Sequence, residues 1–231
     1  MKVLIPMAGA GSRFAKADYS FPKPLISVEG KTMIEKVVEN IGLPQCEHIF
    51  IVQQKHMEEY TLEHHLRQIA PNCKIVTLNS MTEGAACTTL LAKKYIQDES
   101  LLIANSDQIV EWGIGIDIDV SELDGLIYTH EATHPKWSYA KVDEYGYVTE
   151  VAEKKPISTH ATVGVYYWAS GAEYVQCAEK MIADGKRVNN EFYVAPVYNE
   201  LIEQGRYVKI APVRKMWGTG TPEDLELYLN R

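Results

Sequence analysis

The chain begins with the stretch MKVLIPMAGAGSRF, residues 1–14. Residues 2–7 form a short apolar run, which predicts a first β-strand. Gly9 and Gly11 follow directly, and glycines let backbone amides approach a phosphate or a base closely. The order of strand and loop therefore places a candidate anion-binding site at the end of the first strand.

Outward from this stretch, strands and helices alternate. Helix-type spacing at 31–41, 54–69 and 84–96 separates strand-type runs at 48–52, 74–78 and 101–104. This alternation predicts right-handed βαβ units and a mostly parallel sheet, in which ligands bind beyond the carboxyl ends of the strands. The fourth run ends in Asn105-Ser106-Asp107, so a carboxylate follows it as the glycine loop follows the first.

The second half of the chain has a different pattern. Strand-type runs at 125–129, 139–143, 147–151 and 161–168 have no helices between them, and helix-type segments return at 172–183 and 194–203. We therefore expect one continuous domain over 1–231 with an α/β fold: a Rossmann-like three-layer αβα arrangement around a mostly parallel mixed sheet. Residues 1–110 would form a nucleotide-binding half and 111–231 an acceptor-binding half.

Composition excludes several classes of protein. The 231 residues carry a net charge of −8, and a general nucleic-acid binder would instead show a basic surface. No segment is apolar over the roughly 20 residues that a membrane span needs, and the N-terminus is not a signal peptide. The four cysteines form no CxxC pair and are expected as reduced thiols. A cytoplasmic protein with neither nucleic-acid nor membrane partners is expected.

Two basic residues accompany the glycine loop. Arg13 can grip phosphate oxygens in a bidentate way, and Lys23 is held between Pro22 and Pro24, which restrict its backbone. A dinucleotide site would have a third glycine where Phe14 stands, and the Gly-Lys-Ser/Thr of a P-loop is absent. The loop therefore predicts phosphate binding of another kind.

At this point the sequence resembles a known family. Residues 9–13, GAGSR, together with Pro22-Lys23-Pro24, resemble the signature G-x-G-[ST]-R…P-K-P of sugar-phosphate nucleotidyltransferases. The resemblance runs along essentially the whole chain, and GTPEDL at 220–225 is similar to small members from bacterial capsule and surface-polysaccharide gene sets. It implies a nucleotide-diphospho-sugar transferase fold, here without a C-terminal β-helix.

The resemblance implies that Asp107 binds catalytic Mg²⁺, with Arg13 and Lys23 as further catalytic residues. A carboxylate at a strand end suits a hard cation that prefers oxygen ligands. Gln53 or Gln54 would read the base, since an amide offers both donor and acceptor, and Gly84 would let the backbone contact the base edge. The expected nucleotide-binding residues are Ala8, Gly9, Ala10, Gly11, Ser12, Arg13, Lys23, Gln53, Gln54, Glu83, Gly84 and Ser106.

The acceptor would lie against the second half. Glu153 and Lys154 resemble a Glu-Lys-Pro element in which the glutamate holds sugar hydroxyls and the lysine holds the acceptor phosphate. Lys155 intervenes before Pro156, and we prefer Lys154 for this role. Gly164 would leave room for the sugar ring. The expected acceptor-binding residues are Tyr139, Ala140, Glu153, Lys154, Gly164, Asn190 and Glu191.

One position departs from the family pattern. Gly218 stands where the family has an aspartate that is a second metal ligand. Either Asp107 holds Mg²⁺ with phosphate oxygens and water, or another carboxylate such as Glu191 substitutes.

The expected reaction transfers a nucleoside monophosphate from a nucleoside triphosphate to a phosphorylated small molecule, a sugar 1-phosphate in the family's usual case, and releases pyrophosphate. Positioning and electrostatics would supply most of the catalysis, without a serine or cysteine nucleophile. The alternatives are a CTP-dependent enzyme for a non-sugar phosphate such as phosphocholine, a glycosyltransferase of related fold, and an inactive nucleotide-binding protein. The oligomeric state is left open, with a homodimer as the commonest assembly.

Overall fold

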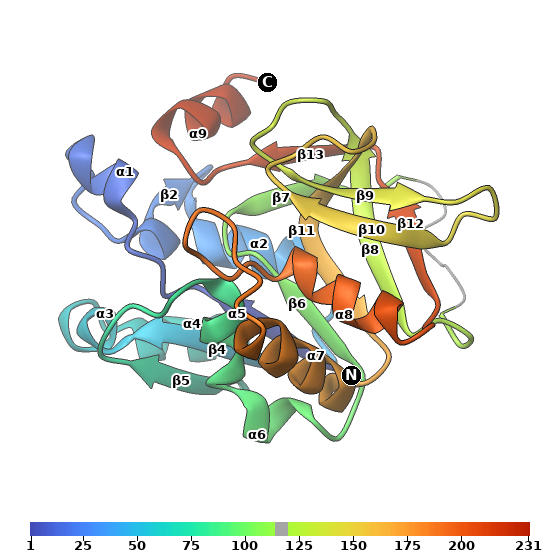
Figure 1. Cartoon of the computed structure of the whole chain (residues 1–231). Coiled ribbons are helices and arrows are strands. Elements are labelled where there is room, and N and C mark those ends of the chain that lie inside the picture. The colour runs from blue at the N-terminus through green and yellow to red at the C-terminus, as the bar shows by residue number, and fades with distance from the viewer. Residues whose placement is uncertain (114–119) are drawn as a thin grey trace.

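A computed structural model describes residues 1–113 and 120–231 (Figure 1). Within these ranges one central sheet contains nine strands and two small ribbons lie beside it. The central strands are β1 Lys2–Pro6, β4 Glu47–Gln53, β5 Lys74–Leu78, β6 Leu101–Ala104, β8 Gly125–Glu131, β9 Ser138–Val142, β10 Val148–Glu153, β11 His160–Trp168 and β12 Val208–Pro212. The ribbons are β2 Ser27–Val28 with β3 Lys31–Thr32, and β7 Gln108–Glu111 with β13 Lys215–Gly218.

The strand order explains where a ligand can bind. Strands β5, β4, β1 and β6 are parallel neighbours in that order, so the chain moves outward from β1 and then returns to its other side. The order therefore reverses between β1 and β6, and open α/β sheets bind ligands beyond the strand ends at such a point. Strand β11 continues the sheet antiparallel to β6 and contacts both β8 and β9.

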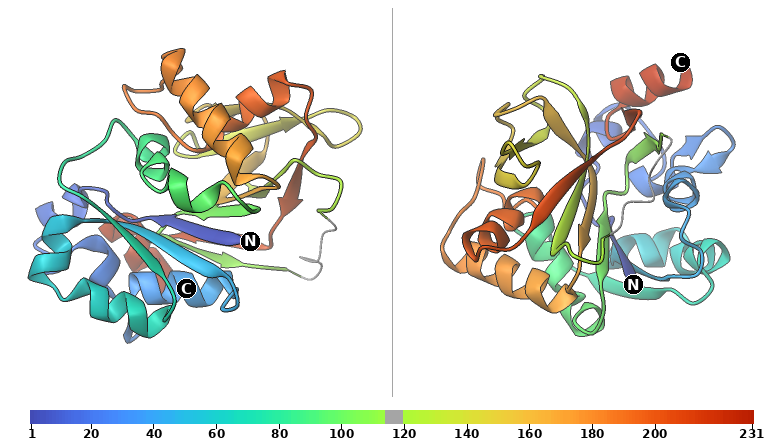
Figure 2. Two further views of the ribbon diagram at one scale, coloured as in Figure 1. Left: turned by 90° about the horizontal axis from the view of Figure 1, so that it is seen from below. Right: turned by 90° about the vertical axis from the view of Figure 1, so that its right-hand side faces the viewer.

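Helices cover both faces of the sheet, which confirms the expected three-layer α/β fold. Figure 2 shows α7 and α8 on one side of the sheet and α2 and α4 on the other. The helices are α1 Ser12–Lys16, α2 Met33–Ile41, α3 Gln54–Glu59, α4 Leu62–Ile69, α5 Ala85–Leu90, α6 Lys93–Ile96, α7 Gly171–Ala183, α8 Tyr198–Glu203 and α9 Pro222–Leu229, with 3₁₀ turns η1 Lys23–Leu25 and η2 Ala195–Val197. None of these helices is long and apolar enough to cross a membrane.

The first strand shows how the apolar run becomes the centre of the core. Leu4 packs into the cluster under α7 and α8, whereas Val3 and Ile5 pack into the cluster under α2 and α4. All three side chains are fully buried. Burial of each such side chain stabilises the fold by about 1.5–3 kcal/mol. Because both faces of the strand are buried, its residues are apolar without alternation, which is why the sequence shows a continuous apolar run.

Serine or threonine caps begin three of the helices. Thr32, Ser170 and Thr221 each accept a hydrogen bond from the backbone N–H three residues later. Such a cap contributes about 1 kcal/mol. The cap at Thr221 also fixes the first turn of α9, whose Asp224 reaches the site described below.

Two segments expected as single helices are broken. The segment 54–69 divides into α3 and α4 at Thr61, which has a left-handed φ of +48°. The segment 84–96 divides into α5 and α6, because the amides of Leu91 and Ala92 bond to carbonyls three residues back and tighten the last turn. Periodicity alone could not locate either break.

The ribbon of β7 and β13 was not expected from the sequence. Its register pairs Gln108 with Gly218 and Ile109 with Trp217. The pairing brings residues 218–221 beside the end of β6, although more than a hundred residues separate the two segments. The C-terminal segment therefore reaches the edge of the sheet where the first-half motifs lie.

Candidate active site

A cleft of about 620 Å³ opens at the carboxyl ends of β1 and β6. It lies at the reversal of strand order, where the sheet topology places a ligand site. The expected residues that line it are Ala8, Gly9, Ala10, Arg13, Lys23, Gly84, Ser106, Asp107, Glu153, Lys154, Gly164 and Glu191. Nucleotide-side and acceptor-side predictions therefore meet in one cavity.

The glycine loop is shaped by Gly11 and anchored by Phe14. Gly11 has a φ of +61° and precedes α1, and its carbonyl accepts the amide of Phe14 at 3.0 Å. Phe14 is buried, which fixes the short helix to the body of the protein. Arg13 is exposed at the cleft, whereas Gly11 and Ser12 do not line it.

The structure corrects the role expected for the two glutamines. The amide nitrogen of Gln53 donates to the carbonyls of Ala8 and Gly9, both at 3.0 Å, so it holds the loop. Gln54 begins α3 and donates to Glu58 one turn later. Neither side chain lines the cleft, and a base-reading role is therefore not supported by their positions.

Lys23 and Asp107 form an ion pair in the cleft. The Nζ atom of Lys23 lies 2.8 Å from Oδ2 of Asp107, and the two side chains are 19% and 23% exposed. Lys23 begins the 3₁₀ turn η1, in which Pro24 is buried. Partial burial strengthens the attraction between the charges, because less water screens it.

The backbone of Asp107 is held by the C-terminal segment. The amide and the hydroxyl of Thr219 donate to the Asp107 carbonyl at 2.8 and 2.9 Å. A β-carbon at Gly220 would lie 2.5 Å from Oδ2 of Asp107, so glycine is required there for the carboxylate to keep its place. The preceding Ser106 is buried.

Gly84 joins the two sides of the cleft. It has a φ of +133°, and a β-carbon there would lie 2.4 Å from the carbonyl oxygen of Phe192. Hydrogen bonds from Phe192 N to Glu83 O and from Ala86 N to Phe192 O, at 2.8 and 2.9 Å, fix the contact. The conformational freedom of Gly84 thus allows close contact with the loop at Phe192, and its contact with a base stays a prediction. Glu83 lies outside the cleft and pairs with Arg187 at 3.3 Å.

Glu153 and Lys154, the residues of the expected acceptor wall, lie at the end of β10 and line the cleft. The Ser138 hydroxyl donates a short hydrogen bond to Glu153, and burial nevertheless raises the pKa of Glu153 above its ordinary value of 4.5. Lys154 has a φ of +54°, and its Nζ atom bonds the Tyr193 hydroxyl and lies 4.5 Å from that ring's centre. Lys155 does not line the cleft, which agrees with the choice of Lys154.

The structure shows the surroundings of four residues that were expected to bind the acceptor. Tyr139 and Ala140 are fully buried and do not line the cleft, and the Tyr139 hydroxyl donates to the His134 carbonyl at 2.7 Å. Asn190 has a φ of +63° at the tip of a tight turn, which turns it away so that only Glu191 reaches the cleft. A β-carbon at Gly164 would lie 1.7 Å from Oε1 of Gln108, so this glycine makes room for a side chain.

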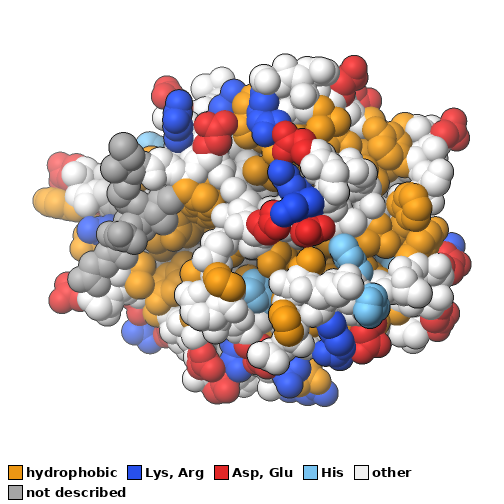
Figure 3. All heavy atoms as spheres, turned by 180° about the vertical axis from the view of Figure 1, so that it is seen from behind, with side chains coloured by type: hydrophobic (Ala, Val, Ile, Leu, Met, Phe, Trp, Pro, Cys, Tyr) orange, Lys and Arg blue, Asp and Glu red, His pale blue; other side chains and the backbone are white. Residues whose placement is uncertain are grey.

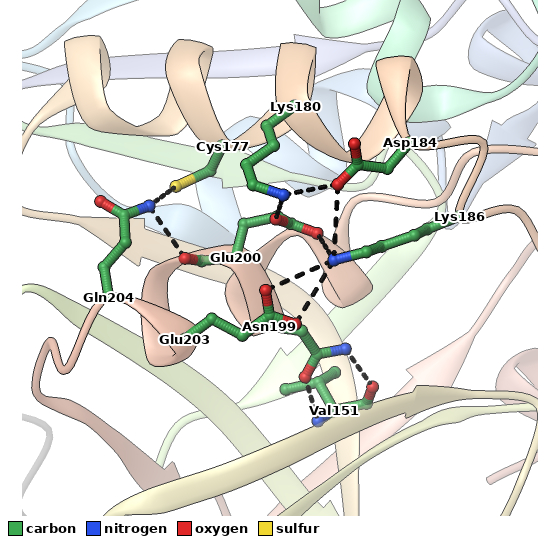
Figure 4. Close-up of polar contacts among 9 residues, drawn as sticks. All are labelled: Val151, Cys177, Lys180, Asp184, Lys186, Asn199, Glu200, Glu203 and Gln204. Atoms are coloured by element: carbon green, nitrogen blue, oxygen red, sulfur yellow. Dashed lines mark hydrogen bonds and ion pairs between the residues drawn. The ribbon is translucent and has the colours of Figure 1, made fainter.

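A buried polar network supports the acceptor wall from behind. Figure 4 shows Glu200 of α8 between Lys180 and Lys186, with Lys180 Nζ 3.0 Å from Oε2. The neighbouring Asn199 bonds both the amide and the carbonyl of Val151 at 2.8 Å. Helix α8 thereby ties α7 to β10, two residues before Glu153.

Sequence reasoning missed several residues that line the cleft. They come from loops, strands and the first turn of α9, and have no motif of their own: Asn105, Gln108, Lys136, Trp137, Ser138, Thr162, Tyr166, Tyr193 and Asp224. Trp137 and Ser138 directly precede the expected Tyr139. Nothing in the sequence pattern pointed to Asp224.

The oxygen donors in the cleft suit a hard cation bound together with phosphate. Asp107 presents its carboxylate into the hollow that Gly220 leaves. In the described residues no group of three or more His, Cys, Asp or Glu side chains is placed to hold a metal by itself. A cation here would therefore use one or two carboxylates, substrate phosphates and water, as Mg²⁺ commonly does.

The face shown in Figure 3 carries Lys and Arg side chains interspersed with Asp and Glu, and hydrophobic side chains between them. It presents no continuous basic surface of the kind that tracks a nucleic-acid backbone.

Comparison with known proteins identifies the family of the chain. The nucleotidyl transferase model matches residues 2–226. The low-salt glycan biosynthesis nucleotidyltransferase Agl11 of Haloferax volcanii is 25% identical over 236 residues, covering 97% of this chain and 64% of that protein. This chain thus spans less than two thirds of that relative.

Two solved structures are similar over nearly the whole chain. The nucleoside-diphosphate-sugar pyrophosphorylase from Vibrio cholerae RC9 is 26% identical, with a TM-score of 0.87 and coverage of 99% of this chain and 100% of that one. The inositol-1-phosphate CTP transferase from T. maritima has a TM-score of 0.77 at 14% identity over 98% and 93% of the two chains, which shows a shared fold. From its sequence match and its cleft, the chain belongs to the nucleotidyl transferase family.

Proposed function

We propose that the protein transfers a nucleoside monophosphate from a nucleoside triphosphate to a sugar 1-phosphate and releases pyrophosphate. One observation carries the proposal: the Lys23–Asp107 ion pair lies beside the glycine loop at the reversal of strand order. A lysine and a carboxylate at that place are suited to a phosphate group and a hard cation.

The nucleotide would lie on the glycine loop. Amides of Ala8, Gly9 and Ala10 border the cleft and suit phosphate oxygens, and Gln53 fixes the two carbonyls of this loop so that it keeps its shape. Arg13 at the cleft would contact the triphosphate. The opposite edge at Gly84 and Thr82 would border the base.

The acceptor would lie between this loop and the acceptor wall. Lys154 would bind the acceptor phosphate, and Glu153 would accept hydrogen bonds from the sugar hydroxyls. An acceptor phosphate oxygen attacks the α-phosphorus, a new P–O bond forms, and the bond between the α-phosphorus and its bridging oxygen breaks. The bridging oxygen leaves with pyrophosphate.

In this reaction the side chains orient and neutralise charged groups, so no covalent intermediate with the protein is needed. Lys23 would stabilise the charge that develops on the α-phosphoryl oxygens. Asp107 would hold Mg²⁺, which when bound neutralises phosphate charge and aligns the reacting oxygens.

Phosphocholine with CTP is a second candidate pair. Trp137 and Tyr193 line the acceptor wall, and a lysine ammonium already lies 4.5 Å from the centre of each ring. Rings that accept these ammonium groups would also accept a quaternary ammonium.

We further propose a cytoplasmic setting, where nucleoside triphosphates are available, and a role in supplying nucleotide sugars for surface polysaccharide. A homodimer stays a prediction, which light scattering on the purified protein would test.

The test is pyrophosphate release over a panel of nucleoside triphosphates and phosphorylated acceptors with Mg²⁺. We expect one pair to dominate, and Asp107→Ala and Lys23→Ala to lower its rate by about 10²–10³-fold. Lys16→Ala is the matched control, because Lys16 is an exposed lysine of α1 that does not line the cleft. Silence over the panel with nucleotide binding intact would instead favour a glycosyltransferase or a nucleotide sensor.

A further inference from the structure

Gly218 stands where the family has an aspartate, so one of the carboxylates expected in the site is missing. It ends β13 opposite Gln108 and lines the cleft. Its φ lies outside the left-handed region, and a β-carbon would be 3.4 Å from Trp137. The backbone therefore does not require glycine at this position, and a β-carbon would be accommodated beside Trp137.

Asp224 brings a carboxylate to this gap from another element. Its Oδ2 atom is 3.6 Å, and its Cγ atom 3.8 Å, from the place where a β-carbon of residue 218 would lie. Asp224 stands in the first turn of α9, where its amide donates to Thr221 Oγ1 at 3.1 Å. The cap thus aims this side chain at the cleft, which it lines.

The short segment 218–220 lies between the two acids. Asp107 approaches the segment at Gly220, where a β-carbon would be 2.5 Å from Oδ2, and Asp224 approaches it at Gly218. Both residues line the same cleft. A side chain at Gly220 would occupy the place of the Asp107 carboxylate, whereas a β-carbon at Gly218 would only contact Asp224.

Each of these carboxylates has a lysine partner within the cleft. Lys23 lies 2.8 Å from Asp107, and Lys136 lies 2.9 Å from Asp224. The Nζ atom of Lys136 also lies 4.5 Å from the centre of the Trp137 ring, which can retain the ammonium when the carboxylate takes another partner. A cation at either acid would replace a lysine that already compensates its charge.

We propose that Asp224 is the second carboxylate ligand of the catalytic cation and replaces the aspartate absent at position 218. The inference rests on the proposed function. Glu191, the other acid considered for this role, faces Glu153 and Tyr193 on the acceptor wall and belongs with them. Two carboxylates with substrate phosphates and water form an ordinary Mg²⁺ site.

The test uses Mn²⁺ in place of Mg²⁺ and counts free Mn²⁺ by electron paramagnetic resonance during titration of the nucleotide-free protein. We expect Asp224→Ala to weaken binding by about tenfold or more, at least the effect of a supporting partner in a metal site. Glu223→Ala is the matched control, because Glu223 is an exposed acid of the same helical turn that does not line the cleft.

Two more variants separate ligation from a structural role. Gly218→Asp in the Asp224→Ala background restores a carboxylate beside the same position, and we expect Mn²⁺ affinity to recover. Lys136→Ala removes the competing ammonium, and we expect it to tighten Mn²⁺ binding. An Asp224 that only stabilises the start of α9 would produce neither effect. Thermal melts verify that each variant is folded, and Asp224→Asn replaces Asp224→Ala if that protein does not fold.

The outcomes distinguish this inference from the proposed function. Unchanged Mn²⁺ binding in the Asp224 variant, with loss in Asp107→Ala, overturns the inference and leaves the proposed cation site intact. If Asp224→Ala weakens Mn²⁺ binding and Gly218→Asp does not restore it, the inference that Asp224 replaces the absent aspartate is also overturned. Unchanged binding in both single variants would remove the cation site of the proposed function itself.

Discussion

The nucleotide side and the acceptor side of the cleft are held in place by different means. On the nucleotide side, Asp107 follows β6 closely and packs against Gly220, and its carboxylate pairs directly with Lys23 of η1. On the acceptor side, Glu153 and Lys154 depend on clamps from distant segments, through Asn199 and the buried Glu200. A substitution that adds a side chain next to Asp107 should therefore disturb the nucleotide side directly. Loss of a contact at Asn199 or Glu200 should instead disturb the acceptor side from a distance.

The largest expected effect comes from Gly220→Ala. The new β-carbon would displace the Asp107 carboxylate and break its pair with Lys23. A displacement of about 1 Å can lower a rate about 100-fold, so we expect kcat/KM to fall by about that factor with little change in melting temperature. Steady-state kinetics would measure it. Gly218→Ala is the control, because its β-carbon meets nothing closer than 3.4 Å; equal losses in the two variants would contradict the argument.

Gly84→Ala should sharpen the comparison, because Gly84 connects the two sides. Alanine at a positive φ destabilises by about 1–3 kcal/mol, and Gly146→Ala, whose β-carbon would meet nothing within 4 Å, should show such a backbone effect alone. The clash with Phe192 should add about 1–3 kcal/mol in Gly84→Ala. Urea unfolding would compare them. If the free energy of unfolding falls by the same amount in both variants, the contact between Gly84 and Phe192 does not exclude a β-carbon.

The adjacent glutamines offer a test within the nucleotide side. Gln53→Leu removes two hydrogen bonds to the glycine loop and should raise the nucleotide KM about tenfold, corresponding to about 1.4 kcal/mol. Gln54→Leu loses only its bond to Glu58 and should leave KM unchanged. A larger effect at Gln54 would restore the base-reading role to that residue.

The smallest expected effect is the pH response of Glu153. Burial raises its pKa in the folded state above 4.5, so the folded protein binds this proton more tightly than the unfolded chain does. Below pH 4.5 the Glu153 carboxyl is protonated in both states and does not lower the free energy of unfolding. As pH rises through the folded pKa, the ionised carboxylate lowers the free energy of unfolding.

Removing this charge should raise stability and weaken acceptor binding together. We expect Glu153→Gln to melt at a higher temperature than the parent at pH 7, with the difference shrinking toward pH 4, and to have a higher acceptor KM. Glu150→Gln, an exposed acid of the same strand, is the control. A difference in melting temperature that grows on acidification would contradict the assigned cause.

The fold and the nucleotide side could be predicted because their signals are local. A buried parallel strand reads as an apolar run, and its carboxyl end is where a ligand site belongs, so the loop at 8–10, Lys23 and Asp107 were placed in the cleft without tertiary information. Gln53 was correctly singled out, but its partner was not, because an amide suits a backbone carbonyl as well as a base.

The acceptor side was less predictable because its residues meet through long-range contacts. The burial of Tyr139 and the turn at Asn190 depend on packing and on a left-handed φ that residue spacing does not reveal. In the first half, the helix breaks at Thr61 and Leu91 were missed for the same reason. The division of the chain into a nucleotide half and an acceptor half stays a prediction, and Gly84 and Phe192 connect the two by direct backbone contact.

The sequence by itself determined the layered α/β fold, the family and the glycine loop with its lysine, because each depends on neighbouring residues and a regular period. Only the tertiary structure decided which carboxylates line the same cleft. Asp224 reaches the cleft through the pairing of β7 with β13 and the cap of α9, and no spacing between residues 107 and 224 encodes that approach. A strand pairing across more than a hundred residues is specified by the packing of the whole core, which a local pattern does not contain.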